Sequence, residues 1–155
     1  MDEYQTMVIA DESTGDNDKA FQVPLGATWH IYNLYAQYTI ASSCSTGTRQ
    51  LRVNILDDAA DVIAEYRAGA TQEVNTVRYY TFAPGLADMD SFRDTDFLTT
   101  PIPGTLVLPT GYSVRIYDQA DIASSGGQDD MDVQLLVGRK STLHKRQSTA
   151  MDSTP

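Results

Sequence analysis

The chain has 155 residues, of which 41% are hydrophobic, and its formal charge at pH 7 is −10. This size and composition predict one globular domain with a hydrophobic core. The acidic start MDEYQTMVIA lacks the pattern of a secretory signal peptide, and no apolar stretch approaches the roughly 20 residues of a membrane-spanning helix, so we expect a soluble protein that is made in a cytoplasm and binds no membrane.

Short segments of alternating apolar and polar residues, separated by Gly, Pro, Asp or Ser, follow one another along the chain. This pattern predicts an antiparallel β-domain in which one face of each sheet is buried. The predicted strands, in chain order, cover residues 4–10, 20–23, 28–40, 49–56, 62–67, 73–82, 105–108, 112–118 and 130–138. Eight or nine strands without a helical period fit a two-sheet sandwich or a closed barrel, and we favour a jelly-roll sandwich of about eight strands.

The predicted domain covers residues 19–140, between an N-terminal arm (1–18) and a polar, basic C-terminal arm (141–155). In segment 28–40 the even positions from Tyr32 to Ile40 are the more apolar, and we expect them to face the core. Trp29, Ile31 and Tyr35 then lie on the opposite face. An outward apolar patch of this kind marks a protein interface more often than a ligand site.

Two turns and one long loop interrupt the strands. Residues 57–61, with three aspartates, predict a hairpin turn with local Asx hydrogen bonds. The letters LPTG do not form a cell-wall sorting signal, and they predict a type I turn with Pro109 second and Gly111 fourth. The loop 83–104 is long for a compact domain. Its Phe92, Phe97 and Leu98 either fold back over the end of the sandwich or meet a neighbouring subunit.

Residues that could carry chemistry do not form a recognisable motif. Asp88, Asp90, Asp94 and Asp96 could offer oxygens to calcium, but the glycine and the bidentate carboxylate of a calcium loop are missing, so we favour a solvated acidic loop. The two histidines, His30 and His144, and the single cysteine, Cys44, match no catalytic pattern. We expect no enzyme activity, no cofactor and no metal, although two carboxylates that the fold brings together could still form a glycosidase site.

Charge is divided unevenly along the chain. Residues 1–138 carry 7 basic and 20 acidic side chains, whereas residues 139–155 carry a formal charge of +3 from Arg139, Lys140, Lys145, Arg146 and Asp152. An acidic body repels nucleic-acid phosphates, so nucleic-acid binding is disfavoured. The basic tail is either a solvated terminus or a segment that docks on an acidic neighbour.

Three stretches together cover most of residues 28–140: RQLRVNILDDAADVIAEYRAG, VRYYTFAPGLADMDSFRDTDFLTTPIP and LVLPTGYSVRIYDQADIASSGGQDDMDVQLLVGRK. Their strand and turn patterns resemble small jelly-roll structural proteins of tailed bacteriophages, which act as capsid decoration, or cement, proteins. The resemblance implies no catalytic residues. It implies a homo-oligomer, a dimer or trimer, that binds the outside of a lattice of major capsid protein and so resides on the virion.

We therefore expect both arms to run across neighbouring subunits, with the four basic residues of the tail against acidic surface there. The alternatives are a tail, collar or head-fibre component, or a β-sandwich module that binds a carbohydrate or a receptor.

Overall fold

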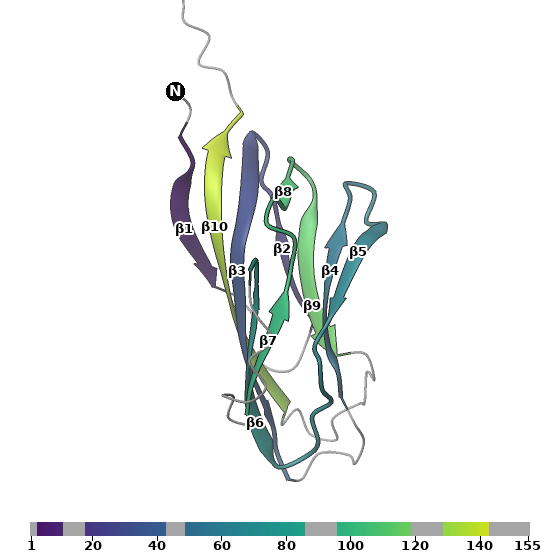
Figure 1. Ribbon diagram of the computed structural model, residues 1–155. Coiled ribbons are helices and arrows are strands. Elements are labelled where there is room, and N and C mark those ends of the chain that lie inside the picture. The colour runs from purple at the N-terminus through teal and green to yellow at the C-terminus, as the bar shows by residue number, and fades with distance from the viewer. Residues whose placement is uncertain (1–2, 11–17, 43–48, 86–95, 119–128, 143–155) are drawn as a thin grey trace, which may run out of the picture.

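The computed structural model describes residues 3–10, 18–42, 49–85, 96–118 and 129–142, and these residues form ten strands in two sheets (Figure 1). The first sheet contains, in spatial order, β1 (Gln5–Ala10), β10 (Asp129–Ser141), β3 (Ala27–Ile40), β6 (Thr76–Ala83) and β7 (Phe97–Pro101), with β8 (Val107–Leu108) paired to β3. The second sheet contains, in spatial order, β2 (Lys19–Gln22), β9 (Ser113–Asp118), β4 (Leu51–Leu56) and β5 (Val62–Arg67). The predicted all-β sandwich is confirmed, and each of the nine predicted strands overlaps an observed one.

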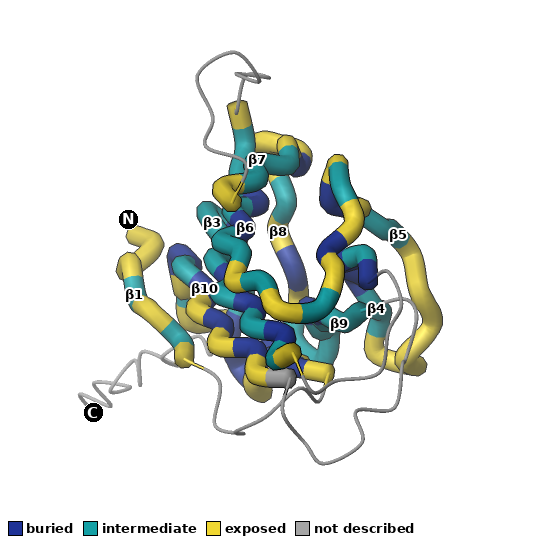
Figure 2. Tube along the Cα trace, turned by 90° about the horizontal axis from the view of Figure 1, so that it is seen from below, coloured by how far each residue is buried: buried dark blue, intermediate teal, exposed yellow. Residues whose placement is uncertain are grey.

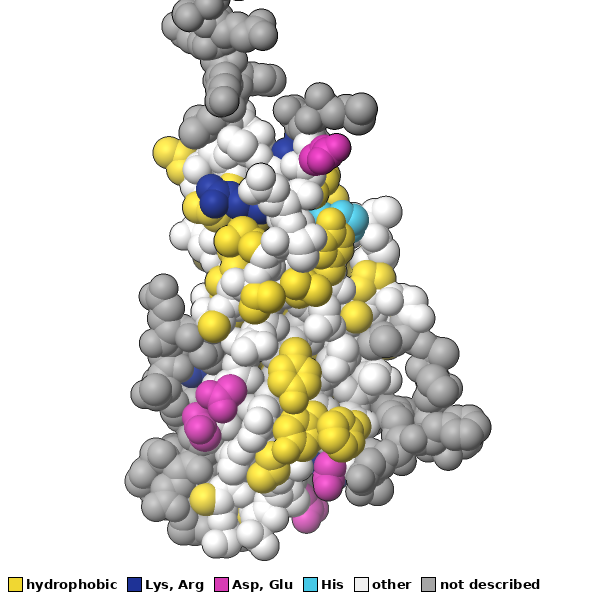
Figure 3. All heavy atoms as spheres, turned by 90° about the vertical axis from the view of Figure 1, so that its left-hand side faces the viewer, with side chains coloured by type: hydrophobic (Ala, Val, Ile, Leu, Met, Phe, Trp, Pro, Cys, Tyr) yellow, Lys and Arg dark blue, Asp and Glu magenta, His cyan; other side chains and the backbone are white. Residues whose placement is uncertain are grey.

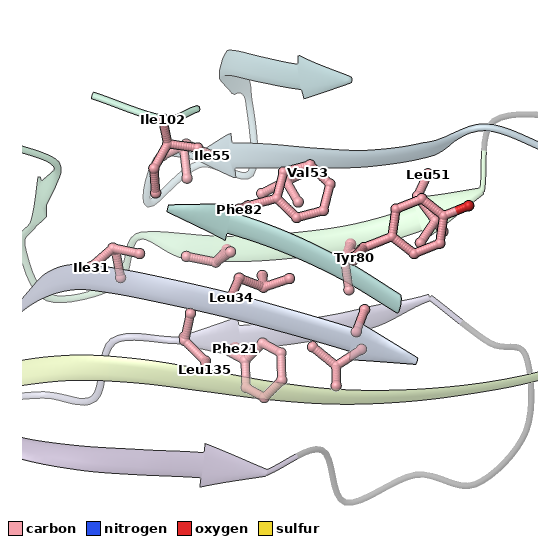
Figure 4. Close-up of a cluster of buried hydrophobic side chains, with 14 of the residues drawn as sticks. Phe21, Ile31, Leu34, Leu51, Val53, Ile55, Tyr80, Phe82, Ile102 and Leu135 are labelled. Carbon is pink, nitrogen blue, oxygen red and sulfur yellow. The ribbon is translucent and has the colours of Figure 1, made fainter. Parts of the chain in front are cut away.

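The buried core residues come from both sheets, and Figure 2 shows them alternating with exposed residues along the strands. In β4, Leu51, Val53 and Ile55 are at most 3% exposed, and they face Leu34 of β3 and Phe82 of β6 across the sandwich (Figure 4). Burying an aliphatic or aromatic side chain of this size contributes about 1.5–3 kcal/mol. The alternation read from the sequence therefore correctly places these side chains in the core.

A β-bulge divides β3 at Tyr32. In the ladder with β10, Leu136 pairs with Asn33 and Val137 pairs with Ile31, so Tyr32 has no residue opposite it. A bulge shifts the alternation of side chains by one position. The odd positions before Tyr32 and the even positions from Leu34 onward consequently face the same side, which is the core.

This bulge overturns part of the predicted outward patch. Trp29 and Ile31 are 4% and 2% exposed and belong to the core, so the prediction that they face outward is wrong. Tyr32, predicted to face the core, lies on the outer face instead. Tyr35, on the other side of the bulge, is half-buried on that outer face, as predicted.

The edges of the first sheet also differ from the prediction. All six residues of β1 pair antiparallel with β10, so the strand predicted at residues 4–10 forms and pairs within the sandwich, although we assigned it to the N-terminal arm. β10 extends to Ser141, three residues beyond the predicted strand end. β7 lies inside the loop 83–104 that we expected to be irregular, and it pairs with β6 in parallel, so the sandwich is not wholly antiparallel.

Both predicted turns form, one of them with a different residue register. Asp57 Oδ1 accepts hydrogen bonds from the backbone N–H groups of Ala59 and Asp61, each at 2.9 Å, which confirms the Asx hairpin. In the LPTG segment the Tyr112 N–H donates to the Pro109 carbonyl, and Gly111 has a φ of 88°. Gly111 is therefore the third residue of a type II-like turn, not the fourth of a type I turn.

Candidate interaction face

The outer face of the first sheet carries a row of aromatic and aliphatic side chains. We call it the aromatic face and define it by Tyr4, Val8, His30, Tyr32, Tyr35, Tyr79, Phe97 and Leu136. Figure 3 looks at the molecule from this side and shows hydrophobic side chains along the middle of the face. Val8 and Leu136 are register partners on β1 and β10, and they lie between the two groups of rings.

The first group consists of Tyr4, His30 and Tyr32. The ring centroids of Tyr4 and His30 lie 6.0 Å apart, and those of His30 and Tyr32 lie 4.8 Å apart. Tyr32 lies over the backbone of Gly138 in β10, where the missing Cβ leaves room for the phenol ring. Lys140 Nζ lies 5.9 Å from the centroid of the Tyr4 ring, a cation–π geometry. The bulge and the glycine together hold these rings on the surface of the sheet.

The second group is a stack of three rings across three neighbouring strands. Tyr79 of β6 lies between Tyr35 of β3, with centroids 6.5 Å apart, and Phe97 of β7, with centroids 4.8 Å apart. The interplanar angles are 22° and 14°, so the rings face one another. Phe97 pairs with Tyr79 in the parallel ladder and is 49% exposed. The stack exposes ring edges and the apolar end of Phe97 to solvent.

Charged side chains lie only at the ends of this face, within the described strands. Asp130 and Asp132 lie at one end of β10 and Lys140 at the other, and the outward positions between them are uncharged. A protein with a formal charge of −10 thus has one broad face that is nearly free of charge. Aromatic enrichment together with depletion of charge is the composition of the centre of a protein interface.

A shallow hollow of about 320 Å³ opens beside the ring stack, lined by Ala10, Tyr35, Gln37, Asp132, Val133 and Gln134. Gln134 is the register partner of Tyr35, and Asp132 is the register partner of Gln37. β1 ends at Ala10, opposite Gln134, so the outward side chains of β10 beyond that point border a step in the sheet. The hollow combines one aromatic ring, two amides and one carboxylate.

The outer face of the second sheet, unlike the aromatic face, carries charged side chains, and these pair with one another. Glu65 Oε1 lies 3.2 Å from Arg52 Nη1 and 2.6 Å from Arg67 Nε, and the Tyr117 hydroxyl donates to Glu65 Oε2. The hydrogen bond from Arg67 holds the pKa of Glu65 below its usual value, with further help from Tyr117 and Arg52 and against the opposing effect of burial. Arg115 stacks on Tyr117 at 4.5 Å. This face is an internally paired polar network.

A third polar group lies inside the sandwich. Gln72 is fully buried, its amide donates to the Tyr38 and Thr76 carbonyls, and the Tyr80 hydroxyl donates to Gln72 Oε1 at 2.8 Å. Burial raises the pKa of Tyr80 to about 12, despite the nearby Arg78. Each of these hydrogen bonds joins Gln72 to another part of the first sheet, so the group stabilises the fold.

The predicted binding residues have different outcomes. The structure brings Tyr35 and Phe97 into one ring stack, through Tyr79, whereas Trp29 and Ile31 are in the core. Arg139 and Lys140 are consecutive residues of β10 and so point to opposite faces. Residues outside the described parts of the chain are Cys44, Asp88, Asp90, Phe92, Asp94, His144, Lys145 and Arg146. Contact of Phe92, Lys145 and Arg146 with a partner stays a prediction.

Sequence reasoning missed Tyr4, Tyr32, His30 and Tyr79 as members of the face. For Tyr79 a signal existed, because Tyr80 and Phe82 alternate with Tyr79 and Thr81 and both pairs could not face inward. Asp96, from the acidic loop for which we considered calcium and favoured a solvated loop, is exposed. The described residues contain no group of three His, Cys, Asp or Glu side chains that could hold a metal ion. No helix in the described part of the chain could span a membrane.

Comparisons with known proteins identify no family for this chain. No family model matches it, and no curated protein matches it. A similar solved structure is described as "Structure of PfGH50B"; it shares 11% sequence identity, and the match has a TM-score of 0.34 and covers 91% of this chain and 22% of that one. The chain therefore spans about a fifth of that protein, and a similarity of this degree carries no argument about fold or function.

Proposed function

We propose that the protein is a structural virion protein of tailed bacteriophages, a decoration protein that binds the outside of the major capsid protein lattice and stabilises the head. The observation that carries this proposal is the aromatic face, which is broad, nearly uncharged and rich in tyrosine on an acidic protein. Exposed apolar surface of this kind marks a site of protein interaction. The resemblance of the strand and turn sequences to phage cement proteins supplies the class of partner.

The strand order supports a jelly-roll type for the sandwich. Without β7 and β8, the sheets read β1-β10-β3-β6 and β2-β9-β4-β5. Most consecutive strands therefore alternate between the two sheets, and the first and last strands are neighbours. Eight strands wound in this way make a jelly roll, an architecture used for viral capsid domains and lectins.

The aromatic face is small, which favours binding to the capsid as an oligomer with several contacts rather than as a monomer with one. Five neighbouring strands at a spacing of about 4.8 Å, each with about six residues at about 3.3 Å, give a face of about 480 Å². A stable interface buries about 800 Å² on each partner. One face alone gives a weak contact, whereas a dimer or trimer on a repeating lattice gains avidity from simultaneous contacts.

The proposal is tested on purified heads. Quantitative mass spectrometry of the virion should give a copy number that is a sizeable fraction of that of the major capsid protein. Purified protein should also bind heads that lack it, and Phe97→Ser and Tyr79→Ser should each weaken this binding. Val62→Ser is the matched control, because Val62 is equally exposed, at 53%, but lies at the edge of the second sheet.

The outcomes separate the candidates. About one copy of this protein for every fifty copies of the major capsid protein would indicate a position at a vertex, in the collar or in the tail. Absence from the virion would overturn the structural role. If the Phe97 variant and the Val62 control bound heads equally well, the protein would bind the capsid through a surface other than the aromatic face. The second candidate, a module that binds a carbohydrate or a receptor, is favoured by one observation, the hollow that places the Tyr35 ring beside two amides.

A further inference from the structure

We propose that β1 pairs with β1 of a second copy of this chain, so that two sandwiches share one continuous first sheet. The role of this dimer rests on the proposed function, and the inference deepens that function by naming the interface of the oligomer that binds the capsid. β1 is an end strand of the first sheet (Figure 1), and within the described part of the chain it pairs only with β10.

Of the four end strands in the two described sheets, β1 alone lacks the features that protect sheet edges. These features are charged side chains, proline, β-bulges and very short length. β7 ends at Pro101, β5 carries Glu65 and Arg67 and pairs with β4 across a bulge, and β2 has only four residues and begins with Lys19. β1 has six residues without charge or proline, its ladder with β10 has no bulge, and its Val8 is 60% exposed. An edge of this kind pairs readily with another strand.

Pairing of a strand with its own copy restricts the register. The N–H and C=O groups of alternate residues point to opposite sides of a strand, and those of directly paired residues point either toward each other or both away. A residue of β1 therefore pairs with one whose number differs from its own by an even number. In the symmetric dimer, one residue consequently lies opposite its own copy.

The charges that flank the strand place Met7 at this centre. Residues 4–10 are uncharged, whereas Glu3 precedes them and Asp11 follows them in the sequence. A ladder centred on Met7 pairs residues 4–10 with the same residues of the copy in reverse order, and both carboxylates stay outside it. A centre one position away in either direction would bring one of these carboxylates into the ladder.

This register turns both aromatic faces to the same side. Met7 and Ile9 pack against the core, so Thr6 and Val8 point to the outer face. Residues opposite each other in a ladder lie on one face of the sheet, so the two-fold axis through Met7 runs perpendicular to the sheet. The two outer faces are then continuous, with an area of about 960 Å², twice that of one face. This exceeds the area of about 800 Å² that a stable interface buries on each partner.

The register is tested by cysteine cross-linking. Met7→Cys in a Cys44→Ser background should form an intermolecular disulfide, because facing Cα atoms lie about 4.5–5.5 Å apart, within the range of about 4.4–6.8 Å that disulfides span. Ile9→Cys in the same background is the matched control, because Ile9 also packs against the core and is half-buried. In this register the two Ile9 Cα atoms lie about 14 Å apart, too far for a disulfide.

Sedimentation equilibrium measures the dimer of the wild type. We expect a dissociation constant between about 1 μM and 1 mM, because a seven-residue contact is smaller than a standard interface. Thr6→Lys should raise this constant about tenfold, because Thr6 faces Val8 of the partner subunit twice in the symmetric dimer. Thr105→Lys, at an exposed position between β7 and β8, makes the same change of net charge and should not raise it. Added salt should strengthen the dimer, because each copy carries a formal charge of −10.

Other outcomes overturn the inference. Equal cross-linking of Met7→Cys and Ile9→Cys would exclude the register centred on Met7. A wild type that stays monomeric at about 1 mM, or a dimer that Thr6→Lys does not weaken, would exclude pairing through β1. If the β1 amides were protected from hydrogen exchange only on heads, while the protein stayed monomeric in solution, the strand would pair with the capsid protein and not with a second copy.

Head binding separates this inference from the proposed function. If the disulfide-linked dimer forms but binds no heads, the capsid partner is wrong and the dimer stands. If the wild type binds heads but forms no dimer, the pairing is wrong and the aromatic face stands as the docking surface. Tighter head binding by the disulfide-linked dimer than by Thr6→Lys supports both.

Discussion

Tyr32 and Gly138 lie against each other on neighbouring strands: a Cβ added at Gly138 would come within 2.8 Å of Tyr32 Cζ. The contact involves the far end of a side chain that is only half-buried, so Tyr32 can move away. We expect Gly138→Ala to cost less than about 1 kcal/mol of folding stability, because alanine itself suits a strand better than glycine does. The same change should displace the Tyr32 ring from His30, measured as a change in the His30 ring-proton NMR shifts.

A double-mutant cycle isolates this contact. In a Tyr32→Ala background, Gly138→Ala should be neutral or slightly stabilising, since the obstructing ring is gone. An equal cost of Gly138→Ala in both backgrounds would mean that the backbone, and not Tyr32, requires glycine at this position.

Tyr80 should make the protein less stable at alkaline pH. Its pKa is about 12 in the folded state, against about 10 in an unfolded chain. Between these values only the unfolded state loses the proton, so the free energy of unfolding falls as pH rises, by up to about 1.4 kcal/mol per pH unit. Tyr80→Phe removes this term and leaves Gln72 Oε1 without its donor, at a cost of about 1 kcal/mol near neutral pH.

Urea unfolding at pH 9, 10 and 11 measures this effect. The difference in stability between wild type and Tyr80→Phe should narrow as pH rises. If the free energies of unfolding of the two proteins fell equally with pH, the loss of stability at alkaline pH could not be assigned to Tyr80.

Glu65 should make the protein less stable at acidic pH. Its pKa is lowered in the folded state, chiefly by the hydrogen bond from Arg67. The stabilisation is therefore present above the unfolded-state pKa, near 4.5, and is lost as pH falls through the lower folded-state value. We expect Glu65→Gln to cost on the order of 1 kcal/mol at pH 7 and progressively less below pH 4.5. Chemical unfolding at pH 7, 5 and 3 measures this, and a cost that stays constant would show that the carboxylate charge is irrelevant.

The sequence predicts those features of this structure that depend on residues close together in the chain. Alternation in β4 and the Asp57 turn depends on neighbouring residues, and both were predicted correctly. The bulge at Tyr32 depends on pairing with β10, more than 100 residues away in the chain. An alternation pattern cannot reveal a one-residue shift of this kind, and this is why Trp29 and Ile31 were placed on the wrong face.

The candidate face was only partly predictable for the same reason. Tyr35 and Phe97 were recognised as residues that could meet a partner. Their connection through Tyr79 requires the parallel pairing of β6 with β7, and β7 lies in a segment whose Asp, Thr and Pro content indicates a loop. The hollow arises where β1 ends along β10, which the sequence of neither strand reveals.

Gly111 should be more sensitive to substitution than Gly85, although both adopt left-handed backbone conformations. Gly111 has a φ of 88° and Gly85 a φ of 69°, and a side chain at either position is strained by about 1 kcal/mol or more. A Cβ at Gly85 would meet nothing within 4 Å, whereas one at Gly111 would lie 3.2 Å from Asp58 Cβ. The Gly111 N–H also donates to the Val23 carbonyl at 3.0 Å.

Gly85→Ala therefore measures the backbone strain alone, and Gly111→Ala measures the strain plus the contact with the β4–β5 turn. We expect Gly111→Ala to destabilise the protein by about 1–3 kcal/mol and by more than Gly85→Ala does, in urea unfolding at pH 7. Asp58→Gly removes the obstructing Cβ, so in that background the two alanine substitutions should have similar costs. If Gly111→Ala remained the more costly there, the extra cost would come from the backbone, through the larger φ of Gly111 or its hydrogen bond to Val23, because the steric contact would no longer exist.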